Sequence, residues 1–330
     1  MRHVRLGRTG LPVSRLCLGT MTFGLQCDEP TSVAILDRAA AAGITFLDTS
    51  DVYPQGGGTR DAGRTEEILG RWLEGRRQDF VVATKCYGAM SARPWDRGLS
   101  RKHILDAIEG SLRRLRTDYV DVYQLHHPDP ATPIDESLRA LDDVVRAGKA
   151  RYVGCSNYFA YQVARAIGRS ELLGLARWDS VQPRYNLLFR QVERELFPLC
   201  AEEGLGVIPY NPIAGGLLSG KHRREAGPLA GTRFTHASVG PTYQERYWHE
   251  RELATVEALR PLAAEAGMSM VQMAVAWVLA NPVVTSPIVG ATRPEQLDDV
   301  VAAIDKDLDA GLKARLDALT QEYRWGDDIR

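Results

Sequence analysis

Short runs of β-branched and other apolar residues alternate with longer amphipathic stretches along almost the whole chain. Runs of this length and composition predict buried strands. They cover residues 15–19, 44–48, 80–84, 119–125, 152–155, 180–182, 206–209 and 287–290. Strands that alternate with helices predict a parallel sheet covered by helices.

Most of the stretches between these runs repeat apolar residues at helical spacing. Ser100 is a candidate N-cap, and the apolar residues that follow it from Ile104 to Leu115 fall on one face. A helix is also expected from Pro133, with Thr132 as its N-cap, to the residue before Gly148, because proline is common at the first helical position and glycine commonly follows a helix end. The same spacing predicts helices over 32–42, 65–74, 161–167, 192–203, 269–280 and 294–303. Residues 211–248 show no clear element and predict a long functional loop.

Two architectures place helices on both sides of a parallel sheet, the doubly wound sheet and the closed barrel. A dinucleotide-binding doubly wound domain carries Gly-x-Gly-x-x-Gly between its first strand and helix, and the chain lacks this motif. We therefore predict an α/β fold of the (β/α)8 TIM-barrel type, which commonly reaches this length. No linker divides the sequence, so residues 1–330 are expected to form one domain, with the long loop after its seventh strand.

Composition and charge narrow the possible partners and compartment. The net charge of −1 provides no general attraction to nucleic acid or to an anionic membrane. The five cysteines form no Cys-x-x-Cys pair, which is typical of a reduced protein. The first ten residues have no apolar core of a signal peptide. We expect a cytoplasmic protein with a small-molecule substrate and neither nucleic acid nor membrane as a partner.

Polar residues gather at the predicted strand ends, where barrel enzymes place their chemistry. Asp48, Lys85 and His126 end three consecutive strands, and Tyr53 lies one loop beyond Asp48. Taken alone, each also fits an ordinary role as a helix cap, surface cation, core histidine or packed aromatic residue. Their joint position at one barrel mouth favours a catalytic group.

The four side chains suit reduction of a carbonyl. A phenol has a pKa near 10 in water, too high for an efficient acid at neutral pH, and the ammonium of Lys85 is expected to lower the pKa of Tyr53. Asp48 would hold the lysine in place, and a neutral His126 would orient and polarise the substrate carbonyl. Nicotinamide would supply the hydride, which no side chain can.

These motifs resemble those of the aldo-keto reductases over almost the whole chain. The segment GITFLDTSDVY contains Asp48 and Tyr53, ATKCYG contains Lys85, and YQLHHPD contains His126 as the first of its two histidines. The resemblance implies that these four residues are catalytic. It also relates the chain to a bacterial NADP-dependent branch and to channel β-subunits of the same family.

The resemblance implies NADPH or NADP⁺ as cofactor and assigns contacts in three groups. The nicotinamide end comprises Thr20, Met21, Asp48, Ser156, Asn157, Gln182 and Tyr210, whose ring would stack on the nicotinamide. The pyrophosphate group comprises Asn211, Pro212, Ile213, Ala214, Gly215, Leu217, Lys221 and Arg233, mainly through backbone amides and the two cations. The adenosine-phosphate group comprises Gly290, Thr292, Arg293, Gln296 and Asp299. Val300 stands where many members have asparagine and cannot make its adenine contact.

The substrate pocket is expected to be lined by aromatic residues and histidines at or just beyond strand ends, namely Phe23, Tyr53, Tyr87, Trp95, His126 and His127. A metal site at His126, His127 and Asp129 is the competing interpretation of the double histidine. We expect no metal, because adjacent strand residues point to opposite faces.

Three functional alternatives stay open. The family also contains NADP-binding regulatory subunits with the same four residues, and an unrelated barrel hydrolase or lyase would bind no NADPH. The stretches KCYGAM and QLHHPD also resemble reductases that act on nucleotide-linked deoxysugars.

Overall fold

The structure is a computed structural model that describes residues 1–306 and 308–326. Its main sheet contains eight parallel strands in the order β10-β3-β4-β5-β6-β7-β8-β9. Their bounds are β3 (Cys17–Gly19), β4 (Phe46–Asp48), β5 (Val81–Cys86), β6 (Val120–Leu125), β7 (Ala150–Ser156), β8 (Ser180–Gln182), β9 (Gly206–Val207) and β10 (Ile288–Val289). A bridge between Val207 and Val284 brings the two edges together, and the amide of Ile288 donates to the carbonyl of Pro209 at 2.7 Å. The predicted (β/α)8 barrel is confirmed, with one strand in each expected segment.

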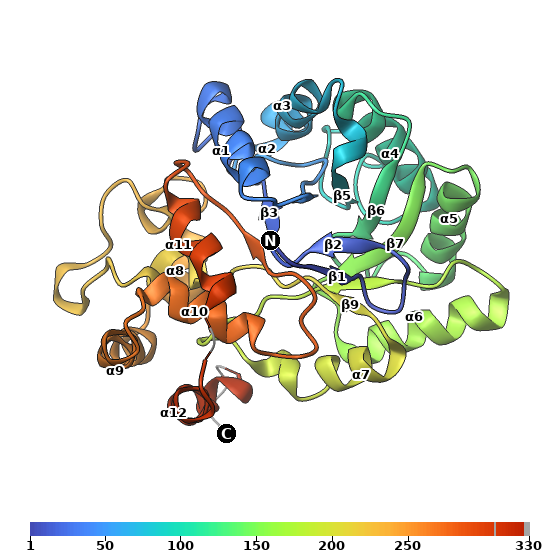
Figure 1. The fold of residues 1–330 in the computed structure, drawn as a ribbon. Coiled ribbons are helices and arrows are strands. Elements are labelled where there is room, and N and C mark those ends of the chain that lie inside the picture. Colours follow the sequence, from blue (N-terminus) through green and yellow to red (C-terminus); the bar gives the residue numbers. More distant parts are fainter. Residues whose placement is uncertain (307, 327–330) are drawn as a thin grey trace.

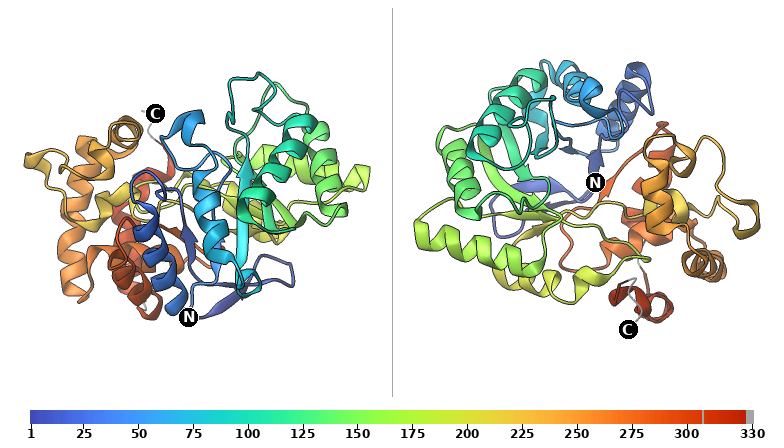
Figure 2. Two further views of the ribbon diagram at one scale, coloured as in Figure 1. Left: turned by 90° about the horizontal axis from the view of Figure 1, so that it is seen from above. Right: turned by 180° about the vertical axis from the view of Figure 1, so that it is seen from behind.

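Helices surround the strands (Figure 1 and Figure 2). Their bounds are α1 (Glu29–Ala41), α2 (Gly58–Asp61), α3 (Arg64–Leu73), α4 (Arg101–Leu115), α5 (Ile134–Arg146), α6 (Ala160–Leu173), α7 (Leu196–Glu203), α8 (Gly240–Tyr247), α9 (Glu250–Glu265), α10 (Met270–Leu279), α11 (Gln296–Ala302) and α12 (Ala310–Leu319). Ser100 caps α4 as predicted, because its side chain accepts a hydrogen bond from the amide of His103. Four of these helices, α2, α8, α9 and α12, were not predicted.

The unpredicted helices have weak sequence signals. Helix α8 begins with Gly240 and Pro241 inside the segment expected to be a loop, and its buried Tyr243 and Tyr247 fix it to the barrel. Helix α9 contains Pro261, a residue that normally interrupts a helix. In these segments tertiary packing outweighs local preference.

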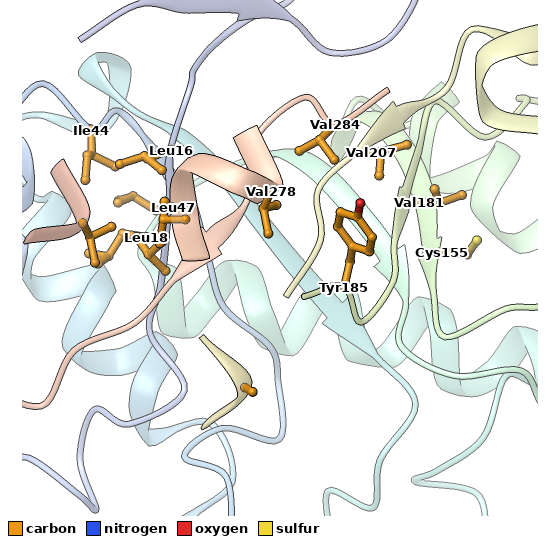
Figure 3. Close-up of a cluster of buried hydrophobic side chains, with 14 of the residues drawn as sticks. Leu16, Leu18, Ile44, Leu47, Cys155, Val181, Tyr185, Val207, Val278 and Val284 are labelled. Atoms are coloured by element: carbon orange, nitrogen blue, oxygen red, sulfur yellow. The ribbon is translucent and has the colours of Figure 1, made fainter. Parts of the chain in front are cut away.

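Side-chain alternation along the strands separates two apolar layers. A short hairpin of β1 (His3–Arg5) and β2 (Pro12–Ser14) lies across one end of the barrel (Figure 1). It contributes to a small buried cluster with inward-facing strand residues, which include Phe46, Ala83 and Val122. Residues of opposite parity, such as Leu18 and Leu47, pack outward against the helices (Figure 3). Asp48 and Lys85 lie two residues beyond Phe46 and Ala83 on the same strands, so their side chains point to the same inward side.

No single helix among residues 1–306 and 308–326 is long and apolar enough to cross a membrane. The consecutive helices α9 and α10 pass that test only as a pair, and they meet at an angle of 91°.

Candidate active site

A cavity of about 1510 Å³ opens at the carboxyl ends of the barrel strands. Its lining includes strand-end residues such as Gly19, Asp48 and Gln182 together with parts of the loop that follows β9. The volume exceeds the range of about 300–1,000 Å³ that is typical of pockets for drug-sized ligands. The cavity therefore has room for a dinucleotide and a second small molecule.

A buried ion pair lies at the base of this cavity. Strand register places Asp48 beside Ala83, so Lys85 follows two residues further along the neighbouring strand on the same inward side. Nζ of Lys85 donates to Oδ2 of Asp48 at 2.6 Å and to the carbonyl of Thr49 at 2.7 Å. Nε2 of Gln182 donates to the other oxygen of Asp48 at 2.8 Å. Burial opposes the charge of Lys85, but Asp48 and Tyr53 nevertheless hold its pKa above the ordinary value.

Tyr53 lies above the pair and lines the cavity. Nζ of Lys85 is 5.0 Å from the centre of its ring. Burial raises the pKa of Tyr53, and the charge of Lys85 opposes that rise. The sequence-based prediction of a lowered pKa is therefore wrong in its net direction, because removing the phenolate from water outweighs the attraction of the ammonium. A protonated Tyr53 is the result at neutral pH.

His126 follows β6 directly and faces Tyr53 edge to face, with 5.8 Å between the ring centres. Burial and the charges of Lys85 and His127 lower its pKa well below the ordinary value, so the ring is neutral. Nδ1 of His126 lies 3.2 Å from Oγ of Ser50. Nδ1 is therefore occupied by Ser50, and Nε2 is the nitrogen left for a ligand in the cavity.

His127 corrects one argument made from the sequence. Its ring stacks on that of His126, with 5.2 Å between the centres, and both residues line the cavity. Strand alternation does not apply to the pair because β6 ends at Leu125. Asp129 is separately engaged, since its carboxylate accepts from the amide of Leu99 and from the hydroxyl of Thr132. The described residues contain no cluster of three potential metal ligands.

The predicted nicotinamide group forms one hydrogen-bonded network. Oγ of Ser156 donates to the carbonyl of Gln182 at 2.7 Å, and Nδ2 of Asn157 donates to the carbonyl of His126 at 2.9 Å. The hydroxyl of Tyr210 donates to Oδ1 of Asn157 at 2.7 Å. These bonds fix four residues relative to His126, namely Ser156, Asn157, Gln182 and Tyr210. All four residues line the cavity, as do Thr20 and Met21.

The loop after β9 contains backbone conformations that are rare for residues other than glycine. Asn211 has φ 60° and Ala214 has φ 49°, and both lie next to the cavity. Gly215 follows with φ 67°, where an added Cβ would lie 2.4 Å from the ring of Tyr243. Such conformations concentrate at ligand-binding sites, where the surrounding structure maintains them. Nδ2 of Asn211 is buried and has no hydrogen-bond partner among the described residues.

Three cations, Lys221, Arg233 and Arg293, line one end of the cavity and lie close enough for the two arginines to act on the charge of Lys221. Lys221 is exposed, but partial desolvation, followed by the charges of the two arginines, lowers its pKa. The guanidinium of Arg233 lies over the ring of Tyr243, 5.1 Å from its centre. None of the three makes an ion pair within the part of the chain that the structure describes. Their mutual repulsion favours an anion at this end.

The predicted adenosine-phosphate residues are also adjacent. The amide of Thr292 donates to Oε1 of Gln296 at 2.8 Å, and Nε2 of Gln272 donates to Oδ1 of Asp299 at 3.0 Å. Gly290, Thr292, Arg293, Gln296 and Asp299 all line the cavity. Val300 also lines the cavity, but it is largely buried and packs in the core cluster, which explains an apolar residue at this position.

Five predicted residues do not line the cavity, and one of them, Lys85, is fully buried beneath it in the pair with Asp48. Phe23 is fully buried in the core, and Trp95 is on the surface with 49% of its area exposed. Both predictions are wrong, because nearness to a strand end does not determine which way a side chain points. Ala214 and Leu217 pack into the core, and the amide of Ala214 donates to the carbonyl of Asn211 rather than into the cavity.

Ser50, Asp51 and Arg246 were not predicted as site residues. Ser50 and Asp51 stand inside the quoted motif GITFLDTSDVY, but the contact of Ser50 with His126 depends on strand register. Arg246 lines the cavity from α8, and its charge contributes after burial to the lowered pKa of His127. Arg246 has no local sequence signal, since α8 itself was not predicted.

Comparison with known proteins agrees with this geometry. The model of the aldo/keto reductase family matches residues 15–321. The chain belongs to the aldo/keto reductase family. The resemblance seen in the sequence motifs is thereby confirmed, and the barrel with Asp48, Tyr53, Lys85 and His126 at one mouth is the form that the family takes in this chain.

The names of relatives in this family imply different functions. The chain is 42% identical to the uncharacterized oxidoreductase YrpG of Bacillus subtilis, over 94% of this chain and 93% of the relative. It is 40% identical to a probable voltage-gated potassium channel subunit beta of Oryza sativa, over 92% of each chain. It is 34% identical to the versiconal hemiacetal acetate reductase of Aspergillus parasiticus, again over 92% of each chain. Family membership supports carbonyl reduction in general terms and leaves the substrate open.

Proposed function

We propose that the chain reduces an aldehyde or ketone to an alcohol with NADPH, and that Tyr53 donates the proton. The observation that carries this proposal is the buried Asp48–Lys85 pair beneath Tyr53, beside a neutral His126, in one cavity. This arrangement provides a protonated acid and two groups that stabilise developing negative charge.

Each side chain has a distinct part in the proposed reaction. Tyr53 is protonated at neutral pH because burial raises its pKa, so its hydroxyl can donate to the carbonyl oxygen. Once the proton has left, the ammonium of Lys85 stabilises the phenolate from below. Asp48 holds that ammonium in place and is itself held by Gln182. His126 is aimed at the same oxygen through Nε2 and polarises it.

NADPH would supply the hydride when bound. The structure fits such a group, because the cavity is large and one end contains three cations without an ionic partner among the described residues. Lys221 and Arg233 would meet the pyrophosphate, and Arg293 with Thr292 would hold a 2′-phosphate. Ser156, Asn157 and Gln182 would hold the nicotinamide amide, with Tyr210 against its ring.

An NADPH-oxidation screen tests the proposal directly. Purified protein is mixed with NADPH and, in separate reactions, with an aromatic aldehyde, a quinone, a keto-sugar and pyridoxal. We expect oxidation of NADPH that depends on at least one carbonyl compound and yields the corresponding alcohol. NADPH binding without turnover of any of them would contradict the enzymatic part of the proposal, and absence of NADPH binding would contradict the cofactor.

A second function is favoured by the relatives described as channel β-subunits. Such a regulatory subunit keeps the same four residues. It would bind NADPH tightly and turn over slowly. The two functions differ in the screen, because a regulatory subunit gives strong binding and little carbonyl-dependent oxidation.

We also propose a cytoplasmic location with a small carbonyl compound as partner. All five cysteines are free and buried, which suits a reducing compartment. Fractionation of the native cells would test this location, and recovery with a membrane or secreted fraction would contradict it.

A further inference from the structure

A series of buried, hydrogen-bonded side chains leads away from the active site behind His126. Oγ of Ser50 lies 3.2 Å from Nδ1 of His126 and 3.2 Å from Oδ1 of Asp51. The same hydroxyl lies 3.4 Å from the carbonyl of Lys85. Ser50 and Asp51 are both fully buried. Ser50 therefore links the imidazole to a carboxyl group that lies outside the cavity.

The environment of Asp51 disfavours its ionised form. Burial, followed by the carboxylate of Glu66, raises the pKa of Asp51 to about 8. Arg114 opposes the rise, but it is paired with Glu66 at 2.8 Å. Asp51 also lies near the thiol of Cys86 and the phenol of Tyr123. The pKa values of both groups are raised, mainly by burial, and a negative charge on Asp51 contributes to the rise. Oδ2 of Asp51 has no hydrogen-bond partner among the described residues.

The hydroxyl of Ser50 has one hydrogen, so whether it donates to His126 or to Asp51 depends on whether Asp51 is protonated. A protonated Asp51 can donate to Ser50, which leaves the hydroxyl of Ser50 free to donate to Nδ1 of His126. A neutral imidazole that accepts at Nδ1 carries its hydrogen at Nε2. An ionised Asp51 instead accepts from Ser50, whose oxygen then accepts from Nδ1–H, and Nε2 presents a lone pair to the cavity.

We propose that Ser50 and Asp51 are positioning residues that set the tautomer of His126. With Asp51 protonated, His126 can donate from Nε2 to a carbonyl oxygen. With Asp51 ionised, the same ring turns a lone pair toward that oxygen and no longer polarises it. The inference rests on the proposed function for its effect on turnover, whereas the tautomer itself can be measured without turnover.

The first test reads the tautomer of His126 in the NADP⁺-bound protein. Histidine labelled with ¹⁵N gives different shifts for protonated and unprotonated ring nitrogens, and the His126 signals are identified by their loss in His126→Gln. We expect hydrogen on Nε2 near pH 6.5, and transfer to Nδ1 with a midpoint near the pKa of Asp51, about 8. The same tautomer at both extremes of pH would overturn the proposal, even if the protein reduces carbonyls.

The second test compares pH profiles of carbonyl reduction. The wild-type kcat/KM should fall about thirtyfold between about pH 6.5 and pH 9.5, because ~3% of a group with a pKa near 8 stays protonated at the upper value. Asp51→Asn keeps a neutral donor toward Ser50, so its kcat/KM should change by less than about threefold over the same range. Ser50→Ala breaks the link and should leave the His126 tautomer independent of Asp51.

A matched control is available in Asp179, a partly buried carboxyl whose pKa burial also raises, to about 6, and which does not line the cavity. Asp179→Asn should keep the wild-type profile. If Asp51→Asn also keeps the wild-type alkaline fall, Asp51 does not control the reaction. If no variant or wild-type protein reduces any carbonyl, the proposed function fails, and the ¹⁵N measurement still decides the tautomer.

Discussion

Lys85 and Asp48 form a buried ion pair, with Nζ of Lys85 2.6 Å from Oδ2 of Asp48 and almost no exposed area on either side chain. Removing both charges from water is costly, so such a pair persists only with good geometry and additional hydrogen bonds. Thr49 and Gln182 provide those bonds. The pair therefore presents a fixed ammonium to the ring of Tyr53.

Lys85→Met tests whether this ammonium tunes Tyr53. The charge of Lys85 opposes the rise of the Tyr53 pKa, so its removal should raise that pKa further. Carbonyl reduction should become slower, and the fall in activity that belongs to Tyr53 ionisation should move to higher pH. The measurement is kcat against pH.

The substitution also leaves Asp48 buried without its partner, which costs about 3–5 kcal/mol in comparable pairs. Lys85→Met with Asp48→Asn is the matched control, since it removes both charges and should recover part of the lost stability. An unchanged pH profile in folded Lys85→Met protein would mean that Lys85 does not tune Tyr53.

Arg293→Ala tests the choice of cofactor. Arg293 is exposed, lines the cavity and makes no ion pair among the described residues. Hydrogen bonds to charged groups contribute ~1.5–3 kcal/mol, so NADPH affinity should fall about tenfold to a hundredfold. NADH affinity should change little, because NADH lacks the 2′-phosphate.

The measurement is fluorescence titration with both cofactors. Arg315→Ala is the control, because Arg315 is an exposed arginine that pairs with Glu265 and does not line the cavity. Equal weakening of NADPH and NADH by Arg293→Ala would assign Arg293 a structural part and leave the NADP preference without a source.

Limited trypsin cleavage tests whether residues 211–248 cover the cofactor. Lys221, Arg223 and Arg224 are exposed in this loop, and Lys221 lines the cavity. We expect NADP⁺ to slow cleavage in the loop, because bound phosphates would hold its cations and backbone. Cleavage sites outside the loop provide the internal control. Equal rates with and without NADP⁺, under conditions where binding is measured, would rule out the covering role.

Much of the fold follows from local patterns. The eight strands arise from short apolar runs, and the barrel follows from their alternation with helices. Helices α9 and α12 were missed, and α9 contains Pro261. Helix α8 was missed because Tyr243 and Tyr247 fix it through contacts distant in sequence.

The candidate site was also predictable only in part from the sequence. Asp48 and Lys85 were predictable because strand ends meet at one barrel mouth. The link from Ser50 to His126 was not, since it joins positions 76 residues apart. The direction in which the Tyr53 pKa shifts could not be predicted from the sequence either, because burial of the ring decides it. Phe23 and Trp95 illustrate the same limit, since side-chain direction in loops depends on the whole fold.

The central claim, that Tyr53 donates the proton, is tested most directly by kcat for carbonyl reduction in Tyr53→Phe. The substitution keeps the ring and removes the hydroxyl, and Tyr87→Phe, another tyrosine that lines the cavity, is the matched control. We predict that Tyr53→Phe lowers kcat by at least ~10²-fold while NADPH affinity stays near the wild-type value, and that Tyr87→Phe keeps most of kcat. A Tyr53→Phe protein with near-wild-type kcat would contradict the account.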